Sequence, residues 1–413
     1  MNATFRPCRA LVFVTCAFLL AACASTLPSS GSPEEVGLSS AKLAELKAAL
    51  QRDVDRGEIA GAVVLVGRHG KIGYFEPVGF RDREAKVPMT RDSIFRIASM
   101  TKPIVTVGAM MLVEEGKLDP AAPVARYLPE FKDVQVGVES KDANGHMVMS
   151  REAPRRAMTV QDLMQHTSGL TYGIFGKSAV KDLYNKANLF DPGQTNAQFV
   201  AKIAKLPLQN QPGEKWEYSM SVDVLGRVIE VVSGQDLETY LKGRVLKPLG
   251  MNETGFWIDD PEQKMRLAEP AIDGSTGKRP VMVQSTKRQA WASGGGGMVS
   301  TAMDYARFCQ FLLNKGELDG VRLISRETFA AMLTPRVKAA DQEFGWGFMI
   351  RVNEKGELPG AVGDLGWAGF YGTYFWVDPK HDLYAVLMAQ LRPNIRNHYR
   401  KLMRDNLYSM PLN

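Results

Sequence analysis

The sequence predicts an α/β chain of the α+β kind, with one antiparallel sheet built from both chain ends, helices flanking it and an inserted, mainly helical region. Two observations lead to this prediction. Strand patterns lie near the start of the chain, over 62–75, and again near its end, over 344–391, whereas 119–334 holds mostly helical segments and long loops. Strands at both ends with helices between them favour a single sheet to which both termini contribute.

The N-terminal elements follow from local patterns. Ser39 or Ser40 is expected to cap a helix, because apolar residues recur after it at helical spacing, namely Leu43, Leu46, Leu50 and Val54. A hairpin follows, with strands over 62–66 and 72–75 joined by a turn that contains glycine. Residues 104–115 predict a strongly apolar helix that ends at a glycine.

The later elements complete the predicted order. Residues 221–233 predict a helix, and a capping pattern that begins at Thr301 predicts another. Alternating aromatic residues over 344–391 predict strands, and a basic amphipathic helix begins near Asn394. We interpret the cations of that helix as the solvated face of a packed helix rather than as a site for anionic lipid. They are Arg396, Arg400, Lys401 and Arg404.

Composition excludes several classes of protein. The 413 residues are 45% hydrophobic and 23% charged, which is typical of a folded globular chain. The formal net charge of +6 is spread along the chain, so nucleic-acid binding is not expected. Three of the four cysteines lie in the first 23 residues, and the fourth, Cys309, lies in an apolar helical pattern as an expected core residue. This distribution of cysteines predicts no disulfide framework. No two histidines have the spacing of zinc ligands, so we expect no metal, and we expect no cofactor.

The first 22 residues resemble a secretory signal peptide, in which an apolar stretch too short to span a membrane follows two arginines. The sequence LAAC that ends at Cys23 is similar to the lipobox of bacterial lipoproteins, so Cys23 is expected to carry lipid and 23–32 to form a tether. The protein is then expected in the bacterial cell envelope, facing the periplasm. The outer membrane is favoured because Ala24, and not aspartate, follows the cysteine. An ordinary signal peptide cut near Ala22 or Ala24 is the alternative.

A serine activated by a lysine one helical turn away acts as a nucleophile without histidine or metal. The pattern S-x-x-K occurs four times, at Ser39-Lys42, Ser99-Lys102, Ser178-Lys181 and Ser275-Lys278. Ser39 is explained as a helix cap, Ser275 lies in a turn and Ser178 lies in a polar stretch. Ser99 differs because it opens an apolar helix, where burial lowers a lysine pKa and helix N–H groups stabilise an oxyanion. From this segment alone, a nucleophile and a simple helix cap are equally good interpretations.

Further motifs follow Ser99 in order along the chain. They are S-M-T-K at 99–102, H-T-S-G-L at 166–170, P-G-E-x-W-x-Y-S at 212–219, S-G-G-G-G-M at 293–298 and G-W-A-G at 366–369. This ordered set resembles the serine β-lactamase and penicillin-binding protein superfamily, most closely the family VIII carboxylesterases, with class C β-lactamases as relatives. The resemblance spans 33–410 and implies a β-lactamase/transpeptidase-like fold. It places the α/β part at about 33–118 and 335–410 and the helical insertion at about 119–334.

The resemblance also implies roles for individual residues. Ser99 would be the nucleophile, Lys102 its base partner, and Tyr218 a second base that donates a proton to the leaving group. The backbone N–H groups of Ser99 and Phe370 would form the oxyanion hole. His166 resembles a position that supports the fold rather than a catalytic one. The glycine run at 294–297 is interpreted as a structural turn, with a role in lining the cleft left open.

Two departures from the lactamase pattern bear on the substrate. Trp367, with Ala368 and Gly369, occupies the place of the superfamily's K-T-G strand, where a lysine would meet the carboxylate of a β-lactam or a terminal D-alanine. Met220 stands where class C β-lactamases carry the asparagine of Y-x-N. A buried carboxylate without a cation is costly, so both changes favour a neutral, apolar ester with a short to medium acyl chain.

Two other functions stay open at this point. One is a class C-like β-lactamase or D-alanyl-D-alanine carboxypeptidase, which uses the same acyl-enzyme chemistry, and weak β-lactam turnover is compatible with an esterase. The other is a non-catalytic envelope lipoprotein that has kept the fold. The presence of Ser99, Lys102 and Tyr218 at the catalytic positions disfavours it. The expected partners are a small ester substrate and, through the lipid anchor, a membrane. The sequence indicates no oligomeric state.

Overall fold

The computed structural model describes residues 29–412, so the predicted signal peptide and the lipid attachment at Cys23 lie outside the described residues. A ten-stranded sheet forms the centre, in the order β1-β3-β2-β16-β15-β14-β13-β12-β11 with β4 paired to β3. Its N-terminal strands are β1 (Ser29–Ser30), β2 (Gly61–Arg68), β3 (Lys71–Asp82) and β4 (Val87–Pro88). Its C-terminal strands are β11 (Val337–Ala339), β12 (Gln342–Phe344), β13 (Met349–Ile350), β14 (Leu365–Ala368), β15 (Tyr374–Asp378) and β16 (Leu383–Ala389).

Strands β2 and β16 join the two ends of the chain. They pair antiparallel, with Ala62 opposite Ala389 and Arg68 opposite Leu383. The other pairings in the sheet are also antiparallel, apart from the two-residue strand β1, which runs parallel to β3. The predicted sheet with strands from both termini is therefore confirmed.

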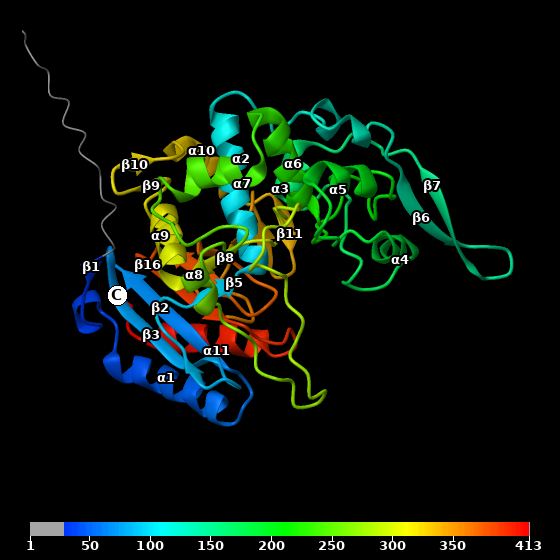
Figure 1. Ribbon diagram of the computed structural model, residues 1–413. Coiled ribbons are helices and arrows are strands. Elements are labelled where there is room, and N and C mark those ends of the chain that lie inside the picture. Colours follow the sequence, from blue (N-terminus) through cyan, green and yellow to red (C-terminus); the bar gives the residue numbers. More distant parts are fainter. Residues whose placement is uncertain (1–28, 413) are drawn as a thin grey trace, which may run out of the picture.

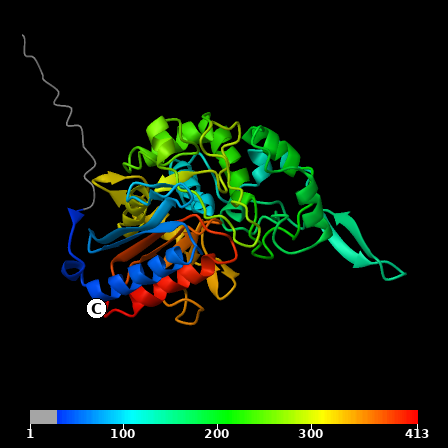
Figure 2. The ribbon, with the colours of Figure 1, turned by 60° about the horizontal axis from the view of Figure 1, so that its bottom comes forward.

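Helices cover both faces of this sheet. Helices α1 (Ser40–Asp55) and α11 (Arg396–Tyr408) lie side by side on one face, as Figure 2 shows in blue and red. Helix α9 (Ala302–Leu313) contacts β2, β15 and β16 on the other face. Side chains of β2 alternate accordingly, since Val63 and Leu65 join the core that includes α9, whereas Val64 and Val66 join the core beneath α1 and α11. The strand carries no polar side chain from Gly61 to Gly67, as expected where both faces of a strand are covered.

Along the chain, the remaining elements fall between the N-terminal and the C-terminal strands of the sheet, apart from η1 (Glu34–Val36). The helices and helical turns are η2 (Ala98–Met100), α2 (Thr101–Glu114), η3 (Val124–Arg126), η4 (Pro129–Phe131), α3 (Val160–Met164), α4 (Ala179–Lys186), α5 (Asn196–Ile203), α6 (Ser221–Ser233), α7 (Leu237–Leu241), η5 (Lys242–Leu246), α8 (Pro261–Met265) and α10 (Arg326–Met332). The small strand pairs are β5 (Ile94–Arg96) with β8 (Val299–Thr301), β6 (Val136–Lys141) with β7 (Met147–Glu152), and β9 (Glu317–Leu318) with β10 (Val321–Arg322). The β6–β7 hairpin extends away from the body of the protein (Figure 1).

Local sequence patterns locate most elements correctly. Ser39 caps α1, Thr301 caps α9, and the helix predicted over 221–233 is α6. The β6–β7 hairpin is not predicted, because its residues are largely exposed and lack the apolar alternation of a half-buried strand. The domain division at 119 and 334 stays a prediction, since α9 falls inside that range and yet packs against the sheet.

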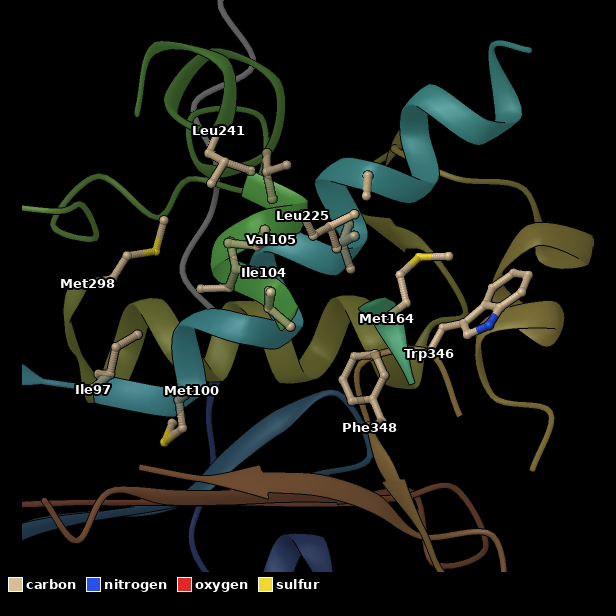
Figure 3. Packing of buried hydrophobic residues seen from close by; sticks show 14 of the residues in the cluster. Ile97, Met100, Ile104, Val105, Met164, Leu225, Leu241, Met298, Trp346 and Phe348 are labelled. Carbon is tan, nitrogen blue, oxygen red and sulfur yellow. The ribbon is translucent and has the colours of Figure 1, made fainter. Parts of the chain in front are cut away.

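Helix α2 is buried along nearly its whole length, and Figure 3 shows its surroundings. Ile104 and Val105 lie among Leu225 of α6 and Leu241 of α7, with which α2 is in contact. A helix that is apolar on all sides is stable only when it is enclosed in this way. Cys309 of α9 is also fully buried, as predicted. Within residues 29–412 no helix has the length and apolar character needed to cross a membrane.

Candidate active site

The four S-x-x-K serines differ in what their side chains do. Ser39 and Ser178 each accept a hydrogen bond from the backbone N–H three residues ahead, at 3.3 and 3.0 Å, so both are helix caps. Ser275 Oγ donates to Asp273 Oδ1 at 2.7 Å within a turn. The side chain of Ser99 caps neither η2 nor α2, and its Oγ lies 3.3 Å from Lys102 Nζ. Of the four serines, Ser99 is the one whose hydroxyl meets its lysine.

The segment before Ser99 has an unusual backbone. Ala98 has a φ of 44°, in the left-handed region that residues with a side chain rarely adopt. Such strain persists where the surrounding structure holds it, and here β5 pairs with β8, with Arg96 opposite Val299. This pairing brings the glycine run at 294–297 against the segment that carries Ser99, and a Cβ on Gly296 would lie 3.7 Å from the Ala98 backbone.

Lys102 is 1% exposed, and three oxygen atoms surround its Nζ. Nζ donates to the carbonyl of Gly295 at 2.6 Å, to the Tyr172 hydroxyl at 3.1 Å and to Ser99 Oγ at 3.3 Å. It also lies 4.7 Å from the ring centre of Tyr218. These contacts hold the amine against the serine hydroxyl and beside both phenols.

Asp223 of α6 holds the glycine run in position. Its Oδ1 accepts from Ser293 Oγ at 2.5 Å and from the backbone N–H of Gly295 at 3.0 Å. Burial raises the pKa of this carboxyl, while the nearby Lys102 and the two donors act in the opposite direction. A Cβ on Gly295 would lie only 2.2 Å from Asp223 Oδ2, so glycine is needed there. The glycine run therefore lines the site, which answers the question left open by the sequence.

Two tyrosines face the lysine from neighbouring loops. Tyr218 is half-buried, and its ring centre lies 5.3 Å from that of Tyr172 and 5.4 Å from that of Trp367. The two loops are tied together because Thr171 Oγ1 donates to Glu217 Oε1 at 2.7 Å. Burial raises the pKa of the Tyr172 phenol well above its usual range, so this group stays protonated at neutral pH.

His166 is buried beside these rings, with its ring centre 4.9 Å from that of Tyr218. Its Nδ1 lies 3.2 Å from Ser219 Oγ, and within the described residues its Nε2 has no partner. Burial, with a smaller contribution from Lys102, holds the pKa of His166 well below its usual value. The ring is therefore neutral and packs against Tyr218, which agrees with the expectation that His166 supports the fold.

The third side of the site is the end of β14 and the turn after it. Trp367 contacts Tyr218 and packs against Phe344, with ring centres 5.1 Å apart. A Cβ on Gly369 would lie 2.6 Å from the carbonyl of Ile97, so the turn lies directly against the segment that carries the nucleophile. Within residues 29–412, the backbone N–H groups of Ser99 and Phe370 have no backbone acceptor. Neither N–H group is therefore committed to a backbone hydrogen bond.

A sequence model of the family described as "Beta-lactamase" matches residues 46–408. The chain belongs to this family. Esterase EstB of Burkholderia gladioli is 32% identical over 392 residues, which cover 87% of this chain and 94% of EstB. The lovastatin esterase of Penicillium rubens is 29% identical and covers 85% of this chain and 97% of its own length. The resemblance to the serine β-lactamase and penicillin-binding protein superfamily is thus confirmed.

Solved structures agree with the family assignment. EstCE1, described as a hydrolase with promiscuous acyltransferase activity, superposes with a TM-score of 0.75 at 28% identity, covering 89% of this chain and 99% of EstCE1. The simvastatin synthase LovD of Aspergillus terreus has a TM-score of 0.75 at 23% identity, covering 91% of this chain and all of LovD, which supports the fold alone. The chain is therefore a β-lactamase-family protein with esterase relatives.

Sequence reasoning missed three features of this family member's site. Tyr172 lies two residues after the end of the H-T-S-G-L motif, and its contact with Lys102 has no local signal. Asp223 was detectable as an acid in the first turn of the apolar helix over 221–233. The expectation of a solvated face on the C-terminal helix is wrong for Arg404, which is 4% exposed, and for Arg400, which donates to the carbonyl of Gly369.

Proposed function

We propose that this protein is a carboxylic ester hydrolase that works through an acyl-enzyme on Ser99. The observation that carries the proposal is the 3.3 Å contact between Ser99 Oγ and the buried Lys102 amine. We assign the backbone N–H groups of Ser99 and Phe370, which have no backbone acceptor in the described structure, to the oxyanion hole. Serine, base and oxyanion donors are the three parts that acyl transfer requires. The esterases among the relatives support an ester as the substrate.

The reaction proceeds in two steps. Ser99 Oγ adds to the ester carbonyl carbon while the Lys102 amine accepts its proton, and the carbonyl oxygen takes the negative charge facing the N–H groups of Ser99 and Phe370. The bond to the alcohol then breaks, and the alcohol oxygen takes a proton from Tyr218, which lies next to Lys102. Lys102 passes the serine proton on to Tyr218, so both groups return to their starting states. Water then adds to the carbonyl carbon of the acyl-enzyme and gives a proton to Lys102, the bond to Ser99 Oγ breaks, and Ser99 Oγ takes a proton from Tyr218 as the acid leaves. The same transfer from Lys102 to Tyr218 completes the cycle. Tyr172, whose phenol stays protonated, orients the amine.

Aromatic rings beside the nucleophile favour an apolar acyl group. The ring centre of Tyr172 lies 5.6 Å from that of Phe175 and 6.4 Å from that of Phe190, and Phe190 lies 6.2 Å from Trp291. Phe190 is 55% exposed, which is unusual for a large apolar side chain at such a site. We assign these rings to the binding of a short to medium acyl chain.

A β-lactamase or D-alanyl-D-alanine carboxypeptidase is the alternative within the same chemistry. It is disfavoured by Trp367, whose indole occupies the position where the superfamily strand carries its cation. Turnover of a chromogenic cephalosporin at a rate comparable to that of an ester would favour it. A non-catalytic role is tested directly by a fluorophosphonate probe, which labels the wild type only if Ser99 is nucleophilic.

The decisive experiment is hydrolysis of p-nitrophenyl butyrate by the wild type, Ser99→Ala and Ser39→Ala. Ser39 belongs to an S-x-x-K pattern that only caps a helix, so it is a matched control. We expect Ser99→Ala to lose about a thousandfold or more in kcat and Ser39→Ala to keep wild-type kcat. Retained activity in Ser99→Ala overturns the assignment.

We further propose that Cys23 carries a lipid and holds the protein at the cell envelope, with the outer membrane favoured. The support is the LAAC sequence behind an apolar, arginine-preceded segment. Labelling with a radioactive fatty acid in the wild type and in Cys23→Ala tests the anchor, and membrane fractionation tests the location. Label retained in Cys23→Ala contradicts the proposal.

A further inference from the structure

Two arginines of α11 reach the turn that follows β14. Arg400 Nη2 donates to the carbonyl of Gly369 at 3.2 Å, and Arg396 Nη1 donates to the carbonyl of Phe370 at 3.0 Å. The Arg396 guanidinium also lies over the Phe370 ring, with Cζ 5.1 Å from the ring centre. Phe370 is expected to supply the second oxyanion donor. Two arginines therefore hydrogen-bond to the carbonyl groups of this residue and of the glycine before it.

Neither guanidinium has an acidic partner within the described residues. The contrast is with Arg404, one helical turn further, whose Nη1 donates to Asp364 Oδ2 at 2.6 Å. Arg400 instead donates to the side-chain amide oxygen of Asn397 at 3.1 Å, and its buried Nε has no partner in the part of the chain that the structure describes. Burial, reinforced by Arg396, lowers the pKa of Arg400 to about 10. Like charges four residues apart on a helix repel each other and cost stability, so these two cations are not explained by packing alone.

Arg400 donates its hydrogen bond to the peptide group that joins Gly369 and Phe370. Gly369 supplies the carbonyl of that group, and Phe370 supplies its N–H, which within the described residues has no backbone acceptor. A donor on the carbonyl polarises the peptide and makes its N–H a stronger donor. The Gly372 N–H also donates to the carbonyl of Gly369, at 3.2 Å, so two bonds fix the direction of this peptide plane.

The charges of the pair also reach the reacting groups. Both arginines interact electrostatically with the phenol of Tyr218. A negative charge that develops between Ser99 and Phe370 during acylation is therefore attracted by two cations that have no other counter-ion in the described structure. Such an attraction becomes stronger as a bound substrate displaces water from the site.

We propose that Arg400, assisted by Arg396, is a positioning residue of the oxyanion hole, which aims and polarises the Gly369–Phe370 peptide and stabilises the charge of the tetrahedral intermediate. This inference rests on the proposed esterase function. The arginines then stabilise the negative charge of the transition state and contribute little to binding of the neutral substrate. Their removal therefore lowers kcat and leaves KM nearly unchanged.

The test compares the wild type with Arg400→Gln, Arg400→Lys, Arg396→Gln and the control Lys401→Gln. Lys401 lies on the same helix, is exposed and pairs with Asp405, so its replacement removes a cation of α11 without touching the turn. With p-nitrophenyl butyrate we expect Arg400→Gln to lose about 10- to 100-fold in kcat with KM within about threefold, and Arg400→Lys to recover part of that loss. The affinity for an alkyl boronic acid, which forms a tetrahedral adduct on the serine, should fall in parallel with kcat.

Three outcomes overturn the inference. The first is wild-type kcat in Arg400→Gln. The second is a loss of activity confined to an ester that carries a carboxylate, which would make the pair a site for a substrate anion. The third is a loss that tracks a lowered melting temperature or is shared by Lys401→Gln, which would indicate a structural role. Absence of ester hydrolysis in the wild type itself refutes the proposed function instead, so the two failures are distinguishable.

Discussion

Gly295 places its carbonyl oxygen 2.6 Å from Lys102 Nζ, the shortest of the three hydrogen bonds that position the amine. The two residues are 193 positions apart and meet because β8 pairs with β5. Asp223 fixes the loop from the other side through the Gly295 N–H. The geometry of the base thus depends on a backbone carbonyl whose position a single methyl group would disturb.

Gly295→Ala tests this dependence. The added Cβ would lie 2.2 Å from Asp223 Oδ2 and must push the loop away from the carboxylate, which moves the carbonyl that holds Lys102. We expect kcat/KM for p-nitrophenyl butyrate to fall about 100-fold, because misplacement by about 1 Å costs this much. Gly274→Ala is the control, since its Cβ meets nothing within 4 Å. Equal activity of the two variants would refute the role of the Gly295 carbonyl.

The contact between Tyr172 and Lys102 predicts a loss of activity in Tyr172→Phe. Removing the hydroxyl takes away a 3.1 Å hydrogen bond and leaves the amine with fewer partners in a buried site. We expect kcat to fall about tenfold or more, with a shifted pH profile of kcat/KM. Tyr384→Phe is the matched control, because its hydroxyl is buried without a partner in the described structure. A Tyr172→Phe enzyme with wild-type kcat and pH profile would contradict the prediction.

Trp367→Lys restores a cation at the position where the superfamily strand carries one. We expect the ratio of cephalosporin to ester turnover to rise about tenfold, since this corresponds to about 1.4 kcal/mol of favourable interaction with a carboxylate. Some stability is lost with the ring contacts to Tyr218 and Phe344. The measurement is kcat/KM for both substrates in the same preparation, and an unchanged ratio would show that Trp367 does not set the substrate class.

Asp304 predicts a pH dependence of stability. Burial raises the pKa of its carboxyl from 3.8 to about 7, although Thr254 Oγ1 and the Glu253 N–H donate to it. The folded state therefore holds the proton more tightly than the unfolded state. The contribution of this group is fully present below about pH 4 and is lost as the pH rises through about 7, by as much as ~4 kcal/mol.

Urea unfolding at pH 5 and pH 8 checks this expectation in the wild type and in Asp304→Asn. The asparagine keeps an acceptor and cannot ionise, so the drop in unfolding free energy from pH 5 to pH 8 should be smaller in the variant. The difference between the two drops isolates Asp304 from other titrating groups. Identical drops would show that this carboxyl titrates normally in the folded protein.

Several parts of the site follow from sequence because their signals are local. The pair Ser99 and Lys102 is one helical turn apart, and an apolar helix follows it, so proximity and burial are both encoded within a dozen residues. The motif order along the chain then points to Tyr218 and Trp367, whose rings the structure places 5.4 Å apart. Helix α6 could be delimited to the residue because its apolar periodicity and its final glycine agree.

Other parts have no local signal. The S-x-x-K pattern is identical in Ser39 and Ser99, and only the positions of neighbouring chains make one a cap and the other a hydroxyl against its lysine. Arg400 and Lys401 are adjacent cations of one helix, yet one reaches the carbonyl of Gly369 and the other pairs with Asp405 on the surface. Helix periodicity assigns a residue to a face, but which face is buried depends on the sheet beneath it.

The sequence by itself determined the α/β class, the order of most elements, the candidate nucleophile and the superfamily, because these depend on spacing and composition within short segments. Only the tertiary structure decided which groups surround Lys102 and that Asp223 holds the glycine run. It also decided that Arg396 and Arg400 donate hydrogen bonds to the turn that contains Phe370. Those contacts join segments that are tens to hundreds of residues apart. Long-range contacts are set by how the sheet and helices pack together, and no local pattern carries that information.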